Sequence, residues 1–242
     1  MSSANGEFGG HPEPTLKRRE YAGTVAYLGL GGVWSLPSKW VGSWDDMRSY
    51  NERHLSRPIH YDRARTTYHS YARNQLARTM RGDWLLMLDC DHEFDPDLVA
   101  RMLLAFERNN FDVLTGLYQY KTPPYQPTVY FWADEGVGVK PVGRWTEEYP
   151  IIQVDAAGAG CLMVRRRVFQ RIARELGEQP FDIKAPYSED LSFFQRLQQL
   201  GVRTFCDTRV RYWHMDTRKI DLHDFQIDAC QLSAPKEIEA YA

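Results

Sequence analysis

The sequence predicts an α/β protein built on a Rossmann-like, mixed and mainly parallel β-sheet flanked by helices. Short apolar, β-branched runs alternate along the 242 residues with segments whose apolar positions recur at helical spacing, a pattern typical of α/β domains. The run Trp84–Leu88 is apolar throughout, which is typical of a strand buried on both faces of a sheet. A chain of this length makes one large domain or at most two small ones.

The N-terminal part begins with a Gly-, Pro- and charge-rich stretch over residues 1–20, which we expect to be a flexible lead-in. The β-branched and apolar run Thr24–Leu30, closed by two glycines, predicts the first strand. We then expect a Trp- and Ser-rich loop followed by a helix, a short strand and a second helix. The loop contains Trp34, Trp40 and Trp44, the first helix lies near Asp45–His54, the strand is Ile59–Tyr61 and the second helix runs from Thr66 to Met80.

After the buried strand, Asp95 and Pro96 predict a helix N-cap followed by proline at the first helical position. The helix that they start has one apolar face at helical spacing, formed by Leu98, Val99, Met102, Leu103 and Phe106. A strand at Val113–Tyr118 follows it.

The C-terminal half predicts a long hairpin excursion over residues 121–150, which are rich in Pro, Gly and aromatic residues. Strands Ile151–Val154 and Cys161–Val164 then flank a loop at 156–160. A helix near Val168–Leu176 and a helix Glu189–Leu200 capped by Ser188 come next. Strands Val202–Cys206 and Val210–Trp213 complete the expected elements, and the polar segment from Met215 is ambiguous.

Composition excludes several classes of protein. The 30 Lys and Arg residues against 32 Asp and Glu give a net charge of −2, which excludes a generic basic footprint for nucleic acid. With 26% charged residues and 13% aromatic residues the chain is not mostly disordered. No run reaches the roughly 18 apolar residues of a membrane span. We see no apolar core of a secretion signal, and the four isolated cysteines suit a reducing compartment, so we expect a cytoplasmic protein.

The sharpest local feature is the pair Asp89 and Asp91 directly after the buried strand. Their spacing of two puts both carboxylates on one face of an extended chain, and ligands of open α/β sheets bind beyond the carboxyl ends of the strands. Two oxygen donors there suit a hard divalent cation such as Mg²⁺ or Mn²⁺. The alternative is that these acids only start a turn or cap a helix, a role that Asp95 is already expected to fill.

Three further signals are weaker when each is taken alone. Ser188-Glu189-Asp190 starts a helix, where acids are also favoured simply by the helix dipole. His214 ends the last expected strand, where it can act as a nitrogen ligand or be structural. Gly158 and Gly160 stand between two strands, where they allow a backbone to approach a ligand closely or serve a plain turn.

In this order, the DxD pair, the small-residue loop, the acidic helix start and the strand-end histidine resemble the GT-A-fold glycosyltransferases, most closely those of family 2. The resemblance covers roughly Thr24 to His214. Its most specific stretches are residues 72–74, 82–91, 154–164 and 188–191, which read Ala-Arg-Asn, GDWLLMLDCD, VDAAGAGCLMV and Ser-Glu-Asp-Leu.

The resemblance implies a hexosyltransferase-type enzyme that uses a nucleoside-diphosphate sugar and Mn²⁺ or Mg²⁺. Asp91 would ligate the metal, Asp89 would assist it or face the ribose, and His214 would complete the site or touch the diphosphate. Asp190 would be the catalytic base of an inverting reaction, with Glu189 oriented toward sugar hydroxyls. The remaining implied donor-site residues are Arg73, Asn74, Gly158 and Gly160. The catalytic domain would span 21–214, and 215–242, with His223 as an alternative ligand, would form a tail or lid.

Two other functions stay open. A sugar-phosphate nucleotidyltransferase can share a similar sheet, but it resembles chains with Arg or Lys in a Gly-rich loop after the first strand, and Gly29–Trp34 has neither. A non-catalytic carbohydrate- or partner-binding protein of the same fold is the second alternative. The acceptor class also stays open among saccharide, protein, small molecule and modified nucleic acid. Aromatic residues of the excursion could stack an acceptor ring or pack a hairpin; these are Tyr118, Tyr120, Tyr125, Tyr130, Trp132 and Trp145.

Overall fold

The computed structural model describes residues 21–30, 36–66, 68–133, 138–143, 145, 148–215 and 219–220. Residues 1–20 and most of the C-terminal segment, including His223, lie outside the described residues. In chain order the elements are β1 (Gly23–Leu30), α1 (Ser38–His54), β2 (Ile59–Thr66), α2 (His69–Thr79), β3 (Trp84–Asp89), β4 (His92–Phe94), α3 (Leu98–Arg108), β5 (Val113–Leu117), β6 (Val129–Trp132), β7 (Val139–Pro141), β8 (Ile151–Val154), β9 (Ala156–Ala157), β10 (Cys161–Arg165), α4 (Arg166–Arg171), a π-helical turn (Ile172–Leu176), α5 (Glu189–Gln199), β11 (Thr204–Met215) and β12 (Lys219–Ile220).

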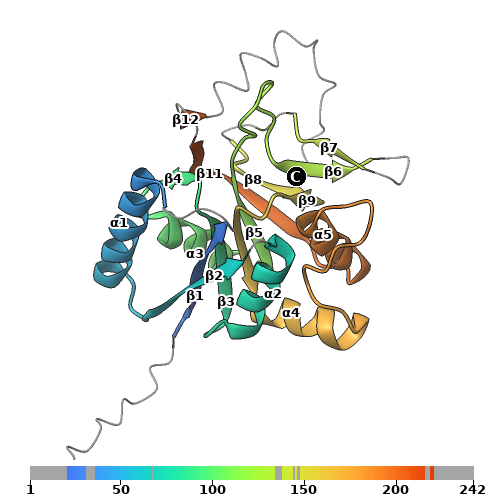
Figure 1. Ribbon diagram of the computed structural model, residues 1–242, viewed down its shortest axis with the longest axis horizontal. Coiled ribbons are helices and arrows are strands. Elements are labelled where there is room, and N and C mark those ends of the chain that lie inside the picture. Colours follow the sequence, from blue (N-terminus) through green and yellow to red (C-terminus); the bar gives the residue numbers. More distant parts are fainter. Residues whose placement is uncertain are drawn as a thin grey trace, which may run out of the picture.

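The central sheet confirms the predicted mixed, mainly parallel arrangement. Its strands follow the order β12-β11-β5-β10-β3-β1-β2, and β4 and β8 add to β11 (Figure 1). Strands β2, β1, β3, β5 and β11 run in one direction, while β10 runs antiparallel between β3 and β5. Strands β6, β7 and β9 form a second, three-stranded sheet, and the β6–β7 pair confirms a hairpin within residues 121–150.

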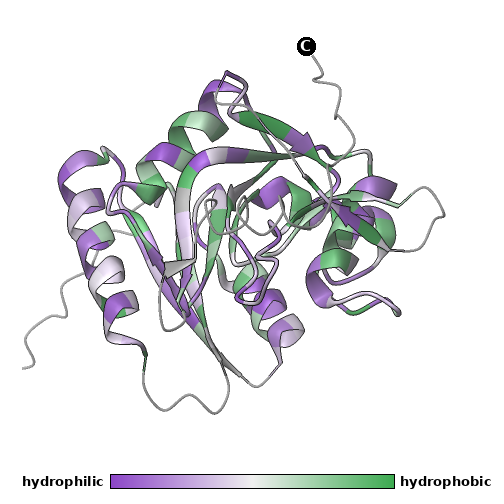
Figure 2. Ribbon diagram, turned by 90° about the horizontal axis from the view of Figure 1, so that it is seen from above, coloured by the Kyte–Doolittle hydropathy of each residue, from purple (hydrophilic) through white to green (hydrophobic). Residues whose placement is uncertain are grey.

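Helices cover both faces of the sheet. The buried residues form two clusters: one joins the sheet to α2, α4 and α5, and the other joins it to α1 and α3. Along β3 the side chains alternate between them, since Leu85 and Met87 belong to the first cluster and Leu86 and Leu88 to the second. The prediction that this strand is buried on both faces is confirmed. Central strands show continuous hydrophobic stretches, whereas the helices change along their length between hydrophilic and hydrophobic residues (Figure 2).

Helix α1 begins seven residues before the predicted start at Asp45. Trp40 and Trp44, which we expected in a loop, lie one helical turn apart and stack with ring centroids 5.2 Å apart. Both are buried, and Trp40 also packs on Tyr27 of β1. Burial of this aromatic face stabilises the extra helical turns, because most helical stability in proteins comes from packing of one face.

Strand β2 is longer than the predicted Ile59–Tyr61. It pairs residue by residue with β1 from Ile59 to Thr66, so α2 begins at His69 rather than at Thr66. The N-cap position of α3 is Asp97 and not Asp95, and its carboxylate pairs with Arg101 at 2.7 Å without capping the helix. The prediction for Asp95 and Pro96 was therefore two residues early.

Three further predictions in the C-terminal half need correction. Ala156 and Ala157, expected in a loop, form β9 and pair with β6. The two strands expected at Val202–Cys206 and Val210–Trp213 are one strand, β11, with a register shift between Asp207 and Arg211. Ser188 occupies the N-cap position of α5, but its hydroxyl contacts the Asp190 carboxylate and does not cap the backbone.

Cys90, Cys161 and Cys206 are buried free thiols. None of the helices in the described part of the chain is long and apolar enough to cross a membrane.

Candidate active site

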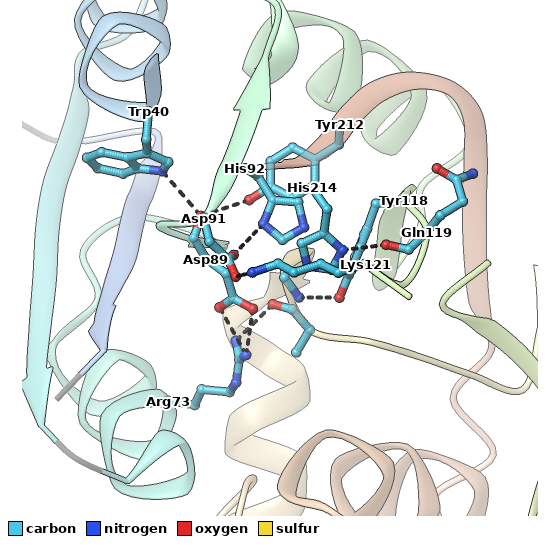
Figure 3. A network of polar contacts seen from close by, with 12 residues as sticks. Trp40, Arg73, Asp89, Asp91, His92, Tyr118, Gln119, Lys121, Tyr212 and His214 are labelled. Atoms are coloured by element: carbon cyan, nitrogen blue, oxygen red, sulfur yellow. Dashed lines mark hydrogen bonds and ion pairs between the residues drawn. The ribbon is translucent and has the colours of Figure 1, made fainter. Parts of the chain in front are cut away.

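The strand ends bring the predicted metal-site residues together. Strand β3 ends at Asp89, and Asp91 follows in the tight turn into β4. Strand β4 pairs antiparallel with the distal half of β11, which places His214 directly opposite His92. Asp91, His92 and His214 each offer a ligand atom, and these atoms all lie within 4.8 Å of one another (Figure 3). Asp89 lies beside this cluster.

Asp91 is surrounded by positive or hydrogen-bonding groups. Its Oδ2 accepts a 2.6 Å hydrogen bond from Lys121 Nζ, and its Oδ1 lies 2.9 Å from His92 Nδ1. Burial alone would raise the pKa of Asp91, but the contacts with His92 and Lys121 outweigh it and hold that pKa well below its usual range. Asp91 is therefore an anion at any pH near neutrality.

His214 is set up as a neutral imidazole. Its Nδ1 donates a hydrogen bond to the backbone carbonyl of Gln119, which leaves Nε2 as the unprotonated nitrogen. Burial, followed by the nearby His92, lowers the pKa of His214 to about 4. A hydrogen bond from one ring nitrogen to a carbonyl is the usual support of a metal-ligating histidine.

His92 was missed by the sequence prediction. Its side chain is fully buried, and neither ring nitrogen makes a well-formed hydrogen bond within the described part of the chain. The ring is stacked on Tyr212 and on His214, with centroid distances of 4.2 Å and 4.0 Å. The available signal was a histidine directly after the DxD pair, but the short β4 strand that aims it gives no periodic pattern.

Arg73 of α2 connects the two acidic motifs. The Arg73 side chain is 3% exposed, and its guanidinium donates to Asp89 Oδ1 at 3.1 Å and to the carbonyl of Ala159 at 2.8 Å. Its Nε lies 3.5 Å from Glu189 Oε1 at the start of α5. Burial would lower the pKa of Arg73, but Asp89 and Glu189 raise it above its usual value, so the buried group stays charged.

Asn74, the next residue, uses its amide on the loop before α5. Its Nδ2 donates to Asp182 Oδ1 at 2.8 Å, and its Oδ1 accepts from the backbone N–H of Phe181 at 2.9 Å. The side chain is buried. These contacts hold the loop that leads to α5.

Gly158 and Gly160 make room for Tyr118. A Cβ on Gly158 would lie 2.3 Å from the Tyr118 hydroxyl oxygen, and one on Gly160 would lie 2.8 Å from it. The backbone N–H of Gly160 donates to that hydroxyl at 3.0 Å. Packing of Tyr118 is thus a sufficient reason for both glycines. Gly160 also borders Asp89, since its Cβ would lie 3.1 Å from Asp89 Oδ2.

Asp190 lies in the first turn of α5, half-buried. Its Oδ1 accepts from the Ser188 hydroxyl and from the backbone N–H of Leu191, while Oδ2 accepts no hydrogen bond from the described residues. Burial raises the pKa of Asp190, and the neighbouring Glu189 adds to the effect. Burial raises the pKa of Tyr118 and of Tyr130, and the charge of Asp190 adds to both increases. The two rings therefore lie near Asp190.

The aromatic excursion places several rings near this end of the site. The hydroxyls of Tyr120 and Tyr130 are 2.7 Å apart, and Trp132 meets Tyr187 edge to face with centroids 5.7 Å apart. Tyr120 is exposed, whereas Tyr118 and Tyr130 are buried. The excursion therefore offers both packed and accessible aromatic surface.

A mixed α/β sheet whose strand ends gather a DxD pair, a histidine and an acidic helix start defines a GT-A-fold glycosyltransferase. Comparison with family models supports this class: the model described as glycosyl transferase family 2 matches residues 42–172, just over half of the chain. The chain belongs to glycosyl transferase family 2. It is thus a glycosyltransferase that uses a nucleotide sugar. No curated protein matches the chain. The matched region contains Asp89 and Asp91 but ends before Asp190 and His214.

Proposed function

We propose that this protein is a metal-dependent, inverting glycosyltransferase that moves a sugar from a nucleoside-diphosphate donor to an acceptor hydroxyl. The catalytic domain spans residues 21–214, with 215–242 as a tail or lid. The observation that carries the proposal is the convergence of Asp91 and His214 at the strand ends, joined through Asp89 and Arg73 to the acidic start of α5. The acceptor is a hydroxyl compound of unassigned class.

A divalent cation fits the residues at the strand ends. Asp91 is ionised, His214 presents an unprotonated Nε2, and neither ring nitrogen of the buried His92 makes a well-formed hydrogen bond among the described residues, although Nδ1 lies 2.9 Å from Asp91 Oδ1. Asp91 and His214, assisted by Asp89, would hold Mn²⁺ or Mg²⁺. Such an ion neutralises the charge that develops on a departing nucleoside diphosphate. Lys121 supplies positive charge to Asp91 in this structure.

Asp190 is the base in this proposal. Its Oδ2, which accepts no hydrogen bond from the described residues, can accept the proton of an acceptor hydroxyl as that oxygen attacks the anomeric carbon. The raised pKa of Asp190 brings its basicity closer to neutral pH than that of an ordinary aspartate. Contacts from Ser188 and Leu191 fix the carboxylate, so placement contributes as well as basicity. Glu189, held by Arg73, is available to sugar hydroxyls.

The decisive test is Asp190→Asn. We expect transfer to fall by about 100- to 10,000-fold, the contribution typical of a general base, while Mn²⁺ and donor binding survive. Asp112→Asn is a matched control, since Asp112 precedes β5 at the end of the sheet opposite to the site and pairs with Arg167. Turnover of Asp190→Asn at the wild-type rate would overturn the assignment of the base.

The donor can be identified by thermal unfolding with UDP, GDP, CMP and dTDP sugars, each with and without Mn²⁺. Stabilisation by one nucleotide that requires the metal would define the donor class. Pyrophosphate release from a nucleoside triphosphate and a sugar phosphate would instead favour a nucleotidyltransferase. Neither binding nor donor hydrolysis across the panel would favour a non-catalytic binding protein.

A further inference from the structure

His92 is the one member of the strand-end cluster that neither the family resemblance nor the proposed function employs. It is fully buried, yet both of its ring nitrogens lack a well-formed hydrogen bond among the described residues. A buried polar group without a hydrogen-bond partner is destabilising. Because Nδ1 lies 2.9 Å from Asp91 Oδ1 and the ring is stacked on His214, the His92 side chain belongs to the same site.

We propose that His92 is a third protein ligand of the metal, so that two imidazoles and one carboxylate hold the ion. The proposal rests on the metal dependence proposed above and extends it to the ligand set and the kind of metal. The antiparallel pairing of β4 with β11 makes His92 and His214 direct cross-strand neighbours. The three ligand atoms are close enough to surround one ion, since all lie within 4.8 Å of one another.

Distances within the cluster suit shared coordination. Adjacent ligands of an octahedral ion with bonds of about 2.1 Å are about 3 Å apart, and His92 Nδ1 is 2.9 Å from Asp91 Oδ1. The stacked rings of His92 and His214 differ by 28° in orientation. Two imidazoles that bind one ion cannot stay face to face, because each ring plane contains its own metal–nitrogen bond. We therefore expect this angle to open when the ion binds.

The ligand set has a consequence for the kind of metal. Mg²⁺ prefers oxygen ligands, whereas imidazole nitrogens favour transition-metal ions, whose affinities rise from Mn²⁺ to Co²⁺. A site with two imidazoles is thus expected to bind Co²⁺ and Mn²⁺ more tightly than Mg²⁺. A site built on Asp89, Asp91 and a single histidine would discriminate less between these ions.

Pulsed EPR of Mn²⁺ bound to the full chain tests the ligand set without any measurement of activity, because directly bound imidazole nitrogens couple to the electron spin. We expect two coupled nitrogens in the wild type, one in His92→Phe and one in His214→Phe. The His92→Phe change keeps an aromatic ring stacked on Tyr212 and His214. We also expect His92→Phe to lower Mn²⁺ affinity at least tenfold, since loss of even an outer partner of a ligand costs 10- to 100-fold.

The control is His223→Gln, which tests whether the second imidazole comes from the C-terminal segment. Two coupled nitrogens in His223→Gln support His92 as a ligand, and one coupled nitrogen overturns that assignment. A single coupled nitrogen in the wild type also overturns the proposal, and this result does not require any His92 variant to fold. If Mn²⁺ does not bind with or without added UDP, GDP, CMP or dTDP, the proposed metal dependence fails. One bound nitrogen refutes only the role of His92.

Discussion

Two carboxylates of the site, Asp91 and Asp190, lie in opposite electrostatic surroundings. Asp91 is flanked by Lys121 and two histidines, and its pKa is held well below the usual range despite burial. Asp190 lies at a helix start beside Glu189 and aromatic rings, and its pKa is raised by burial. Arg73 lies between these ends and contacts Asp89 on one side and Glu189 on the other.

The difference separates the roles of the two groups. A carboxylate that stays ionised suits a permanent partner of a cation, whereas one with a raised pKa suits proton transfer near neutral pH. We therefore propose a division of roles in which Asp91 supplies negative charge and Asp190 supplies basicity. The proposals for Asp91 as a metal ligand and Asp190 as a base both follow from this contrast.

Among variants that distinguish Asp91 from Asp190, we expect the largest loss of function for Asp91→Asn. The variant removes a charged ligand, so we expect Mn²⁺ binding and transfer to be lost together, transfer by at least about 100-fold. Asp190→Asn should lose transfer alone. Titration calorimetry with Mn²⁺, run beside a transfer assay, measures both properties. If Asp91→Asn bound Mn²⁺ as tightly as the wild type, the contrast between the two carboxylates would fail.

The Arg73→Met variant tests the connection that Arg73 makes between Asp89 and Glu189. The change leaves Asp89 and Glu189 without their buried cation, and breaking such a pair costs about 3–5 kcal/mol in free energy of unfolding. Both carboxylates are partly exposed, so we expect a loss of free energy of unfolding at the lower end of this range. Urea denaturation measures this loss. Arg73→Lys keeps the positive charge but not the planar guanidinium contacts. We expect its free energy of unfolding to lie between those of Arg73→Met and the wild type. Equal stability of Arg73→Met and wild type would contradict a connecting role.

The pH dependence sharpens the comparison further. A base with a raised pKa takes up its proton at a higher pH than an ordinary aspartate, so transfer should fall with decreasing pH before Asp91 is protonated. His214, with a pKa of about 4, also stays neutral over most of this range. Profiles of kcat/KM and of Mn²⁺ affinity, measured on the same samples, should therefore separate. Profiles that fall together would argue against Asp190 as the titrating base.

Much of the fold could be predicted because its signals are local. The apolar run of β3 predicted a central strand, and the strand-helix alternation predicted the mixed sheet. The start of α1 was missed, although Trp40 and Trp44 stand four residues apart on one helical face. Their tryptophan- and serine-rich surroundings suggest a loop until packing against Tyr27 is known. Strand β2 was cut short because its last residues gain their order from pairing with β1.

The part of the site that could be predicted was likewise the part whose residues are close in sequence. Asp89 and Asp91 lie at and just after the end of a clearly predicted strand, so their position at the carboxyl end of that strand could be inferred. The partnership of His92 and His214 joins residues 122 positions apart in the numbering and depends on the pairing of β4, a strand of three residues. Such pairing has no sequence pattern. The glycines were predicted as residues that need close approach, but the group that approaches them, Tyr118, comes from another strand end.

The smallest expected effect concerns Lys121, which lies on Asp91 where a cation would also bind. The Lys121 side chain is 39% exposed, and ion pairs of such exposed side chains contribute about 0.2–1 kcal/mol. Lys121→Met should therefore raise Mn²⁺ affinity in the absence of donor by about 1.4- to 5-fold, because the metal no longer competes with the lysine. Lys121→Arg keeps the charge and should leave the affinity near that of the wild type. A lower Mn²⁺ affinity in Lys121→Met would mean that the lysine supports the metal-binding arrangement of Asp91, and the two cations would then be partners rather than competitors.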